Sequence, residues 1–125
     1  MPWDYDETNV FARILRGEIP CTKVLETEHS LAFRDLNPQA PVHVLVIPRG
    51  PYRSWDHFAA EASGDEMADF VRAVGEVARL EGVSTERGGG FRLISNAGAD
   101  AVQEVPHLHV HVVGGRSLGR ILQKM

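Results

Sequence analysis

The feature that most constrains the fold is the stretch "VPHLHVHVVGG", residues 105–115, in which histidine alternates with apolar residues. Each kind of side chain recurs at every second position, the apolar ones at Leu108, Val110 and Val112 and the imidazoles at His107, His109 and His111. Side chains two positions apart on a β-strand project from the same face, about 6.5 to 7 Å from one another. The alternation therefore predicts a strand over residues 107–113, with one face on the core and a solvated face made only of imidazole.

The length and composition predict a single domain over residues 1–125. The chain has 43% hydrophobic and 24% charged residues, enough to bury a core without disulfides, and its one cysteine, Cys21, has no intramolecular partner. The start "MPWDYDETN" lacks the basic flank and apolar run of a secretory signal, so we predict a cytoplasmic protein. The net charge of -4 and apolar runs as short as "VLVI" favour neither a nucleic-acid nor a membrane partner.

Two helices and five strands are expected along the chain. A short helix follows Asn9 in "VFARILRGEIP" and stops at Gly17, and a longer one runs from a Ser63 cap to about Leu80, where Gly82 closes it. The residues expected to turn this longer helix to the core are Met67, Phe70, Val71, Val74 and Val77 or Ala78. The strands are "TKVLET", "SLAFRDL", "VHVLVIP", "GFRLIS" and the histidine strand, with "NAGADAVQEVP" as a loop. This pattern predicts an α+β fold with an antiparallel sheet of about five strands.

The alternating histidines predict a reactive centre for phosphorus chemistry. Neutral imidazole is a nucleophile for phosphorus, and protonated neighbours donate hydrogen bonds to phosphoryl oxygens. Two alternatives stay open: the histidines are ordinary strand residues, or they bind a metal. Histidines two apart on a strand can ligate zinc, but a closed site needs four ligands and Cys21 is isolated in the sequence.

Three blocks of the chain resemble a known family. They are "VFARILRGEIP", "LAFRDLNPQAPVHVLVIPR" and "RLISNAGADAVQEVPHLHVHVVGGR", which together span about residues 9–117. In order and spacing they are similar to consecutive blocks of the histidine triad family, and the "GGR" ending resembles its Hint-like nucleoside phosphoramidase branch. The resemblance implies a fold in which two such sheets join across a homodimer.

The resemblance also implies a set of site residues. His109 matches the nucleophile that attacks the α-phosphorus of a nucleotide, with His107, His111 and His43 as its active-site partners. The positions that match nucleotide-binding residues are Asp35 for the ribose, Asn96 and Gln103 for the phosphate and leaving group, Glu104 where relatives have Ser or Thr, and Phe11, Ile14, Phe33 and Leu36 for the purine base. Asp35 could instead be a turn acid, and the apolar four could be ordinary core residues.

The implied function is hydrolysis of purine nucleoside phosphoramidates, or of aminoacyl or lysyl adenylates, with an AMP or GMP moiety and no cofactor. Asn9 and Ala12 stand where many bacterial relatives have the Cys-x-x-Cys of a zinc site, so we predict no metal. The alternatives are a dinucleoside polyphosphate hydrolase of the Fhit-like branch and a nucleotide-binding interaction module. The remaining histidines, His29 and His57, are expected to be solvated.

Overall fold

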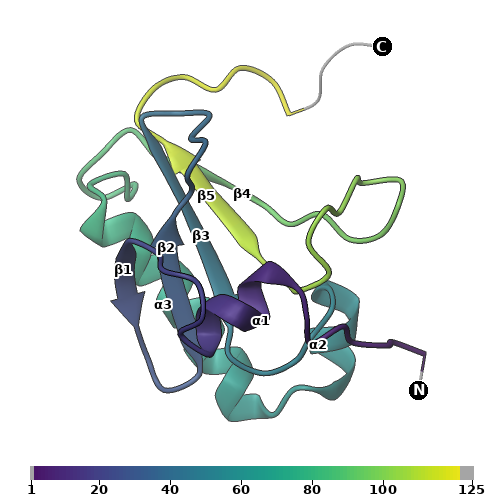
Figure 1. Ribbon diagram of the computed structural model, residues 1–125. Helices are drawn as coiled ribbons and strands as arrows, with labels where there is room; N and C mark the ends of the chain where they lie inside the picture. The colour runs from purple at the N-terminus through teal and green to yellow at the C-terminus, as the bar shows by residue number, and fades with distance from the viewer. Residues whose placement is uncertain (1, 122–125) are drawn as a thin grey trace.

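The computed structural model describes residues 2–121 and contains a five-stranded, wholly antiparallel sheet between helices (Figure 1). Residues 1 and 122–125, the ends of the predicted 1–125 domain, lie outside the described residues. The strands are β1 (Lys23–Glu26), β2 (Ser30–Arg34), β3 (Val42–Pro48), β4 (Phe91–Ile94) and β5 (Val110–Gly114), in the spatial order β1-β2-β3-β5-β4. This architecture confirms the predicted fold class.

The long helix α3 (Gly64–Leu80) covers one face of the sheet. The Ser63 side chain accepts a hydrogen bond from the Glu66 N–H, and the Glu66 side chain accepts one from the Ser63 N–H, so the predicted cap is present. Its buried residues pack against Leu108, Val110 and Val112 in one core cluster, which confirms the apolar half of the alternation. Val71, in contrast, is 64% exposed, because the buried stripe runs through positions 70, 73, 74 and 77 and residue 71 points away from it.

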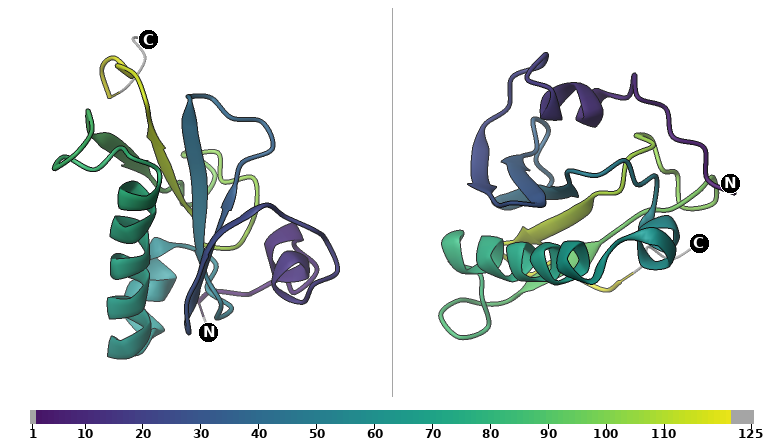
Figure 2. Two further views of the ribbon diagram at one scale, coloured as in Figure 1. Left: turned by 90° about the vertical axis from the view of Figure 1, so that its left-hand side faces the viewer. Right: turned by 90° about the horizontal axis from the view of Figure 1, so that it is seen from below.

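The short helix α1 (Val10–Leu15) covers the opposite face, so the sheet lies between two helical layers (Figure 2). The Asn9 side chain accepts a hydrogen bond from the Ala12 N–H at 2.9 Å, and Gly17 continues the chain with a φ of 77° that glycine adopts without strain. Phe11 packs there on a second core cluster that contains Phe33. The face that the sequence predicts to be solvated is therefore covered.

A second short helix, α2 (Trp55–Glu61), precedes α3 and is absent from the sequence prediction. Its seven residues are too few to display a clear period, and Ser54 makes no side-chain cap bond. His57 in this helix is buried rather than solvated, because the Trp3 ring stacks on it at 5.0 Å and the Arg53 N–H donates to its Nδ1. Within residues 2–121, no helix has the length and apolar character needed to cross a membrane.

The strand β5 begins at Val110, three residues later than the alternation predicts. Its pairing with β3 ends at Val46 and Val110. In the same register the next hydrogen-bonded pair would be Pro48 and Leu108, but Pro48 has no N–H to donate. The Leu108 N–H donates instead to the Tyr52 carbonyl at 2.8 Å. His107 and His109 therefore precede the strand and take their positions from other contacts.

Candidate active site

A cavity of about 510 Å³ opens beside α1 and brings together most of the predicted site residues. Those that line it are Phe11, Ile14, Phe33, Asp35, Leu36, Asn96, Glu104, His109 and His111. His43, His107 and Gln103 do not line it. The cavity has an apolar wall, to which Leu45 and Val105 also contribute, and a polar wall that carries two imidazoles. This combination suits a ligand with a flat apolar part and an anionic part.

The position and protonation of His109 follow from one backbone contact. Its Nδ1 lies 2.8 Å from the His107 carbonyl oxygen, which can only accept, so Nδ1 carries the proton and Nε2 has a free lone pair. Among the described residues Nε2 has no partner, and no fully buried side-chain nitrogen or oxygen is unpaired, so Nε2 is reached from the cavity. Burial lowers the pKa of His109 and favours the neutral imidazole, which is the nucleophilic form.

His111 is connected to a second layer of polar groups. The Gln39 N–H donates to His43 Nδ1 at 3.1 Å, which places the His43 proton on Nε2. That nitrogen lies 2.9 Å from His111 Nδ1 and 3.4 Å from Asp35 Oδ2. His111 therefore accepts at Nδ1 and carries its own proton on Nε2, as a donor for a ligand. Burial, and to a smaller extent His109 and His43, lower the pKa of His111 to about 4.

His107 has a different environment from its two neighbours. It is 0% exposed, its Nε2 donates to the Pro48 carbonyl at 2.9 Å, and its Nδ1 lies 2.6 Å from the Tyr5 hydroxyl. Burial lowers its pKa to about 4. The expectation that all three imidazoles share a solvated face and reach one anion is therefore wrong, because both nitrogens of His107 are already bonded away from the cavity. Sequence reasoning missed Tyr5, which lies 102 positions away and carries no local signal.

Asp35 combines the two roles that the sequence leaves open. Its Oδ1 accepts a hydrogen bond from the Asn37 N–H at 2.8 Å, as a turn acid does, while Oδ2 faces His43 and the side chain lines the cavity. The neighbouring Leu36 is 89% exposed and lies at the surface of the cavity, not in an enclosed slot. Phe11 and Phe33, whose rings meet edge to face at 5.5 Å, are both core residues and cavity lining.

The loop before the histidines is held by Gln103. Its Oε1 accepts from the Gly98 N–H at 3.1 Å, and its Nε2 donates to the carbonyls of Arg53 and Val105 at 2.6 and 3.1 Å. These bonds direct the Gln103 amide into the protein, not toward a ligand. The adjacent Val102 lines the cavity and has a φ of 56°, in the left-handed region. The sequence did not indicate this residue, because a residue pattern does not specify the backbone angle of a single valine.

Three potential metal ligands lie together in the site. Asp35, His43 and His111 offer atoms that are all within 4.8 Å of one another. His43 already bridges the other two by its Nε2, and a closed zinc site needs a fourth ligand. Asn9 and Ala12, the positions that lack the two cysteines, are joined by the helix cap instead.

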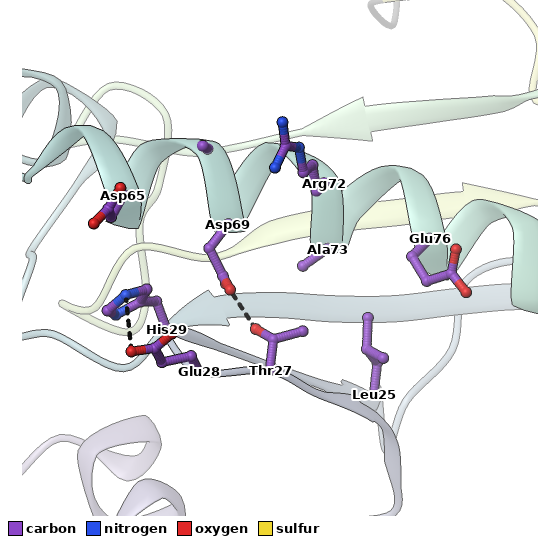
Figure 3. A pocket seen from close by; sticks show the side chains of 10 residues that line it. Leu25, Thr27, Glu28, His29, Asp65, Asp69, Arg72, Ala73 and Glu76 are labelled. Atoms are coloured by element: carbon purple, nitrogen blue, oxygen red, sulfur yellow. Dashed lines mark hydrogen bonds and ion pairs between the residues drawn. The ribbon is translucent and has the colours of Figure 1, made fainter.

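A larger hollow of about 580 Å³ lies elsewhere, between α3 and the β1–β2 hairpin, and contains none of the predicted site residues (Figure 3). Half of its lining residues are charged, and Asp69 is already bonded to the hydroxyls of Thr27 and Ser30, each at 2.7 Å. The cavity beside α1 is therefore the candidate active site.

Comparison with known proteins shows the family to which the chain belongs. A family model for the HIT domain matches residues 16–118. A 13.2 kDa HIT-like protein of Azospirillum brasilense is 62% identical over 120 residues, which cover 96% of each chain. The purine nucleoside phosphoramidase of Escherichia coli K12 is 36% identical over 116 residues, 93% of this chain and 94% of that one. The solved structure of a HIT family hydrolase from Clostridium thermocellum is similar with a TM-score of 0.79 and 36% identity, and the match covers 94% of this chain and 99% of that one. The chain belongs to the HIT, or histidine triad, family and has the fold of its hydrolases.

Proposed function

We propose that the protein hydrolyses purine nucleoside phosphoramidates, or aminoacyl or lysyl adenylates, at the α-phosphorus through a nucleotide covalently bound to His109. The observation that carries this proposal is the free Nε2 of His109, which the His107 carbonyl holds unprotonated at the cavity wall. The phosphoramidase relative from Escherichia coli supports the same chemistry.

The proposed reaction has two displacements at phosphorus. In the first, His109 Nε2 forms a bond to phosphorus while the P–N bond of a phosphoramidate, or the P–O bond of an adenylate, breaks. A leaving amine takes up a proton from water, which leaves hydroxide, whereas a leaving carboxylate departs as the anion. In the second, water attacks the phosphorus, the P–Nε2 bond breaks and neutral His109 is released. The proton that this water loses neutralises the hydroxide of the first step or, after an adenylate, passes to the solvent. His111 and Asn96 both line the cavity. We expect the Nε2–H of His111 and the amide of Asn96 to donate hydrogen bonds to phosphoryl oxygens, which carry more charge in the transition state.

The rest of the cavity suits the nucleoside. We propose that the purine base lies against Phe11, Ile14 and Phe33, and that Asp35 accepts hydrogen bonds from the ribose hydroxyls. Leu36 and Glu104 also line the cavity, and we expect Leu36 to cover the outer part of the base and Glu104 to face the leaving group. Because imidazole supplies the nucleophile, no metal-activated water is needed, and chelation is expected to leave turnover unchanged.

We also propose a homodimer, with a second copy of this chain against β4. This strand is at the end of the sheet, so its outer edge is unpaired among the described residues. Trp55, Val71 and Leu93 are exposed there and line an apolar hollow of about 460 Å³. Light scattering is expected to give twice the mass of one chain, and a monomer at micromolar concentration would contradict the proposal.

The test of the covalent intermediate is a rapid quench at mildly alkaline pH. A peptide spanning residues 105–116 of the wild-type protein is expected to carry the mass of one added nucleotide. His109→Ala should abolish both the adduct and turnover while AMP still binds, because the pocket stays and only the attacking nitrogen is lost. His29→Ala, which lies outside the cavity, is the control. Full turnover by His109→Ala would exclude this nucleophile, and binding by the wild type without turnover would favour an interaction module.

A second candidate function, dinucleoside polyphosphate hydrolysis, is favoured by a specific observation. A cavity of about 340 Å³ adjoins the site, shares His111 and Asn96 with it, and is lined by Arg92 and Arg116. Two guanidinium groups suit a polyphosphate leaving group. Turnover of an adenosine phosphoramidate and of diadenosine triphosphate separates the two candidates, since faster cleavage of the triphosphate would replace the first proposal with the second.

A further inference from the structure

The segment that carries the nucleophile is not held by the sheet. Residues 105–109 precede β5, and most of their backbone hydrogen bonds are made outside the strand ladder. The His107 N–H donates to the Val105 carbonyl and the Leu108 N–H to the Tyr52 carbonyl, each at 2.8 Å. The Val105 carbonyl also accepts from the Gln103 amide at 3.1 Å, and the His109 carbonyl accepts from the Ser95 hydroxyl at 3.0 Å. The His107 carbonyl, in contrast, bonds to the His109 ring, and the His107 ring is itself held by the Pro48 carbonyl and the Tyr5 hydroxyl. The orientation of the His109 ring therefore depends on the placement of a histidine that does not line the cavity.

The partners of the His107 ring fix its protonation without ambiguity. The Pro48 carbonyl can only accept, so His107 Nε2 carries the proton, and Nδ1 must accept from the Tyr5 hydroxyl. The two rings meet edge to face with centroids 5.6 Å apart, so the contact is also packed. Burial raises the pKa of Tyr5, which keeps its hydroxyl protonated as a donor. A residue near the N-terminus thus completes the hydrogen bonds of a buried histidine 102 positions away.

We propose that Tyr5 is a positioning residue for the reaction: its hydroxyl holds His107 in the Nε2–H tautomer, and thereby keeps the His107 carbonyl on His109 Nδ1. This inference rests on the proposed function, in which His109 Nε2 is the nucleophile. Without the Tyr5 hydroxyl, His107 Nδ1 is buried without a partner, and the ring gains by rotating or by moving its proton. Either change releases the contact to Pro48 and shifts the carbonyl that orients His109. His109 is then free to carry its proton on Nε2, the form that cannot attack.

The variant that tests this proposal is Tyr5→Phe, which keeps the ring and removes the donor. The matched control is Tyr52→Phe, because the Tyr52 hydroxyl donates to Glu66 and lies outside the cavity lining. In single-turnover experiments, Tyr5→Phe is expected to slow nucleotide transfer to His109 by about tenfold to a hundredfold, as misplaced catalytic groups do. Its Kd for AMP should stay within about twofold of wild type, because the residues that line the cavity are unchanged. The variant alters the orientation of the His109 ring, on which the transfer rate depends. The control should alter neither quantity by more than about twofold.

Nitrogen-15 NMR of the histidine rings gives a readout that a merely structural role would not move. In the wild type, His107 is expected to be protonated at Nε2 and His109 at Nδ1. Tyr5→Phe should change both signals, and Tyr52→Phe neither. Wild-type transfer rates in Tyr5→Phe, or unchanged histidine signals, would overturn the proposal. If Tyr5→Phe does not fold, the wild-type spectrum alone tests the proposal. A His107 protonated at Nδ1 would overturn it, because that nitrogen could not accept from the Tyr5 hydroxyl. Absence of a His109 adduct in the wild type would instead refute the proposed function, whatever the histidine signals show.

Discussion

The histidines of this site differ in their partners more than in their positions. His109 donates from Nδ1 to a backbone carbonyl, whereas His111 accepts at Nδ1 from His43, so the two rings present a lone pair and a proton, respectively, to the same cavity. Residues two apart in the chain have opposite hydrogen-bonding capacity, which is what attack on a phosphate and stabilisation of its oxygens require.

Asp35 offers a test of ribose binding. Asp35→Asn is expected to weaken binding of AMP more than of 2′,3′-dideoxy-AMP, because only AMP loses hydrogen bonds to a charged acceptor, each worth roughly 1.5 to 3 kcal/mol. Calorimetric titration of both ligands on both proteins gives the difference. Equal losses would mean that Asp35 serves only the turn at Asn37 and its contact with His43.

Val102 offers a test of backbone strain at the cavity. It is a β-branched residue with a φ of 56°, and its side chain is 68% exposed, so little packing offsets the strain. Val102→Gly is expected to raise the free energy of unfolding in urea by about 1 kcal/mol, since glycine adopts this conformation freely. The same change should weaken AMP binding, because it removes part of the cavity lining. Lower stability of Val102→Gly would contradict the strain argument.

The helix α1 closes the histidine face and also forms a wall of the site. Its cap is Asn9, and the long helix α3 has an equivalent cap in Ser63. Asn9→Ala and Ser63→Ala are each expected to lower the free energy of unfolding by about 1 kcal/mol, the usual cost of a lost N-cap. Only Asn9→Ala should also raise the Kd for AMP, because α1 carries Phe11 and Ile14 into the cavity and α3 carries no lining residue. An equal effect of both variants on AMP affinity would contradict this division between the helices.

The whole fold should lose stability in mild acid because it buries His107 uncharged. The pKa of His107 is lowered from 6.5 to about 4, so between these values the unfolded chain binds a proton that the folded chain does not. Stability therefore falls as the pH falls from 6.5 towards 4, by up to about 3 kcal/mol from this residue. Urea unfolding at pH 7, 5.5 and 4.5 is expected to show the loss, and calorimetry at pH 5 should show proton uptake on unfolding. Constant stability over this range would mean that His107 is charged in the fold.

Local patterns were sufficient for most of the secondary structure. The alternation at Leu108, Val110 and Val112, the Ser63 cap and the glycine after α1 each depend on residues within one turn or one strand, and each prediction is confirmed. The family resemblance indicated the candidate site residues, and nine of them line the cavity. Their catalytic and binding roles stay predictions.

Only the tertiary structure decided which side of the histidine stretch is buried and which ring nitrogens have no hydrogen-bond partner among the described residues. The start of β5 at Val110 depends on Pro48 in a neighbouring strand, and the burial of His107 depends on α1 and on Tyr5, far away in the sequence. A period of two specifies that side chains share a face, but it contains no information about what covers that face. Solvent exposure and protonation are set by contacts between distant segments, and these exist only once the sheet and both helical layers have assembled.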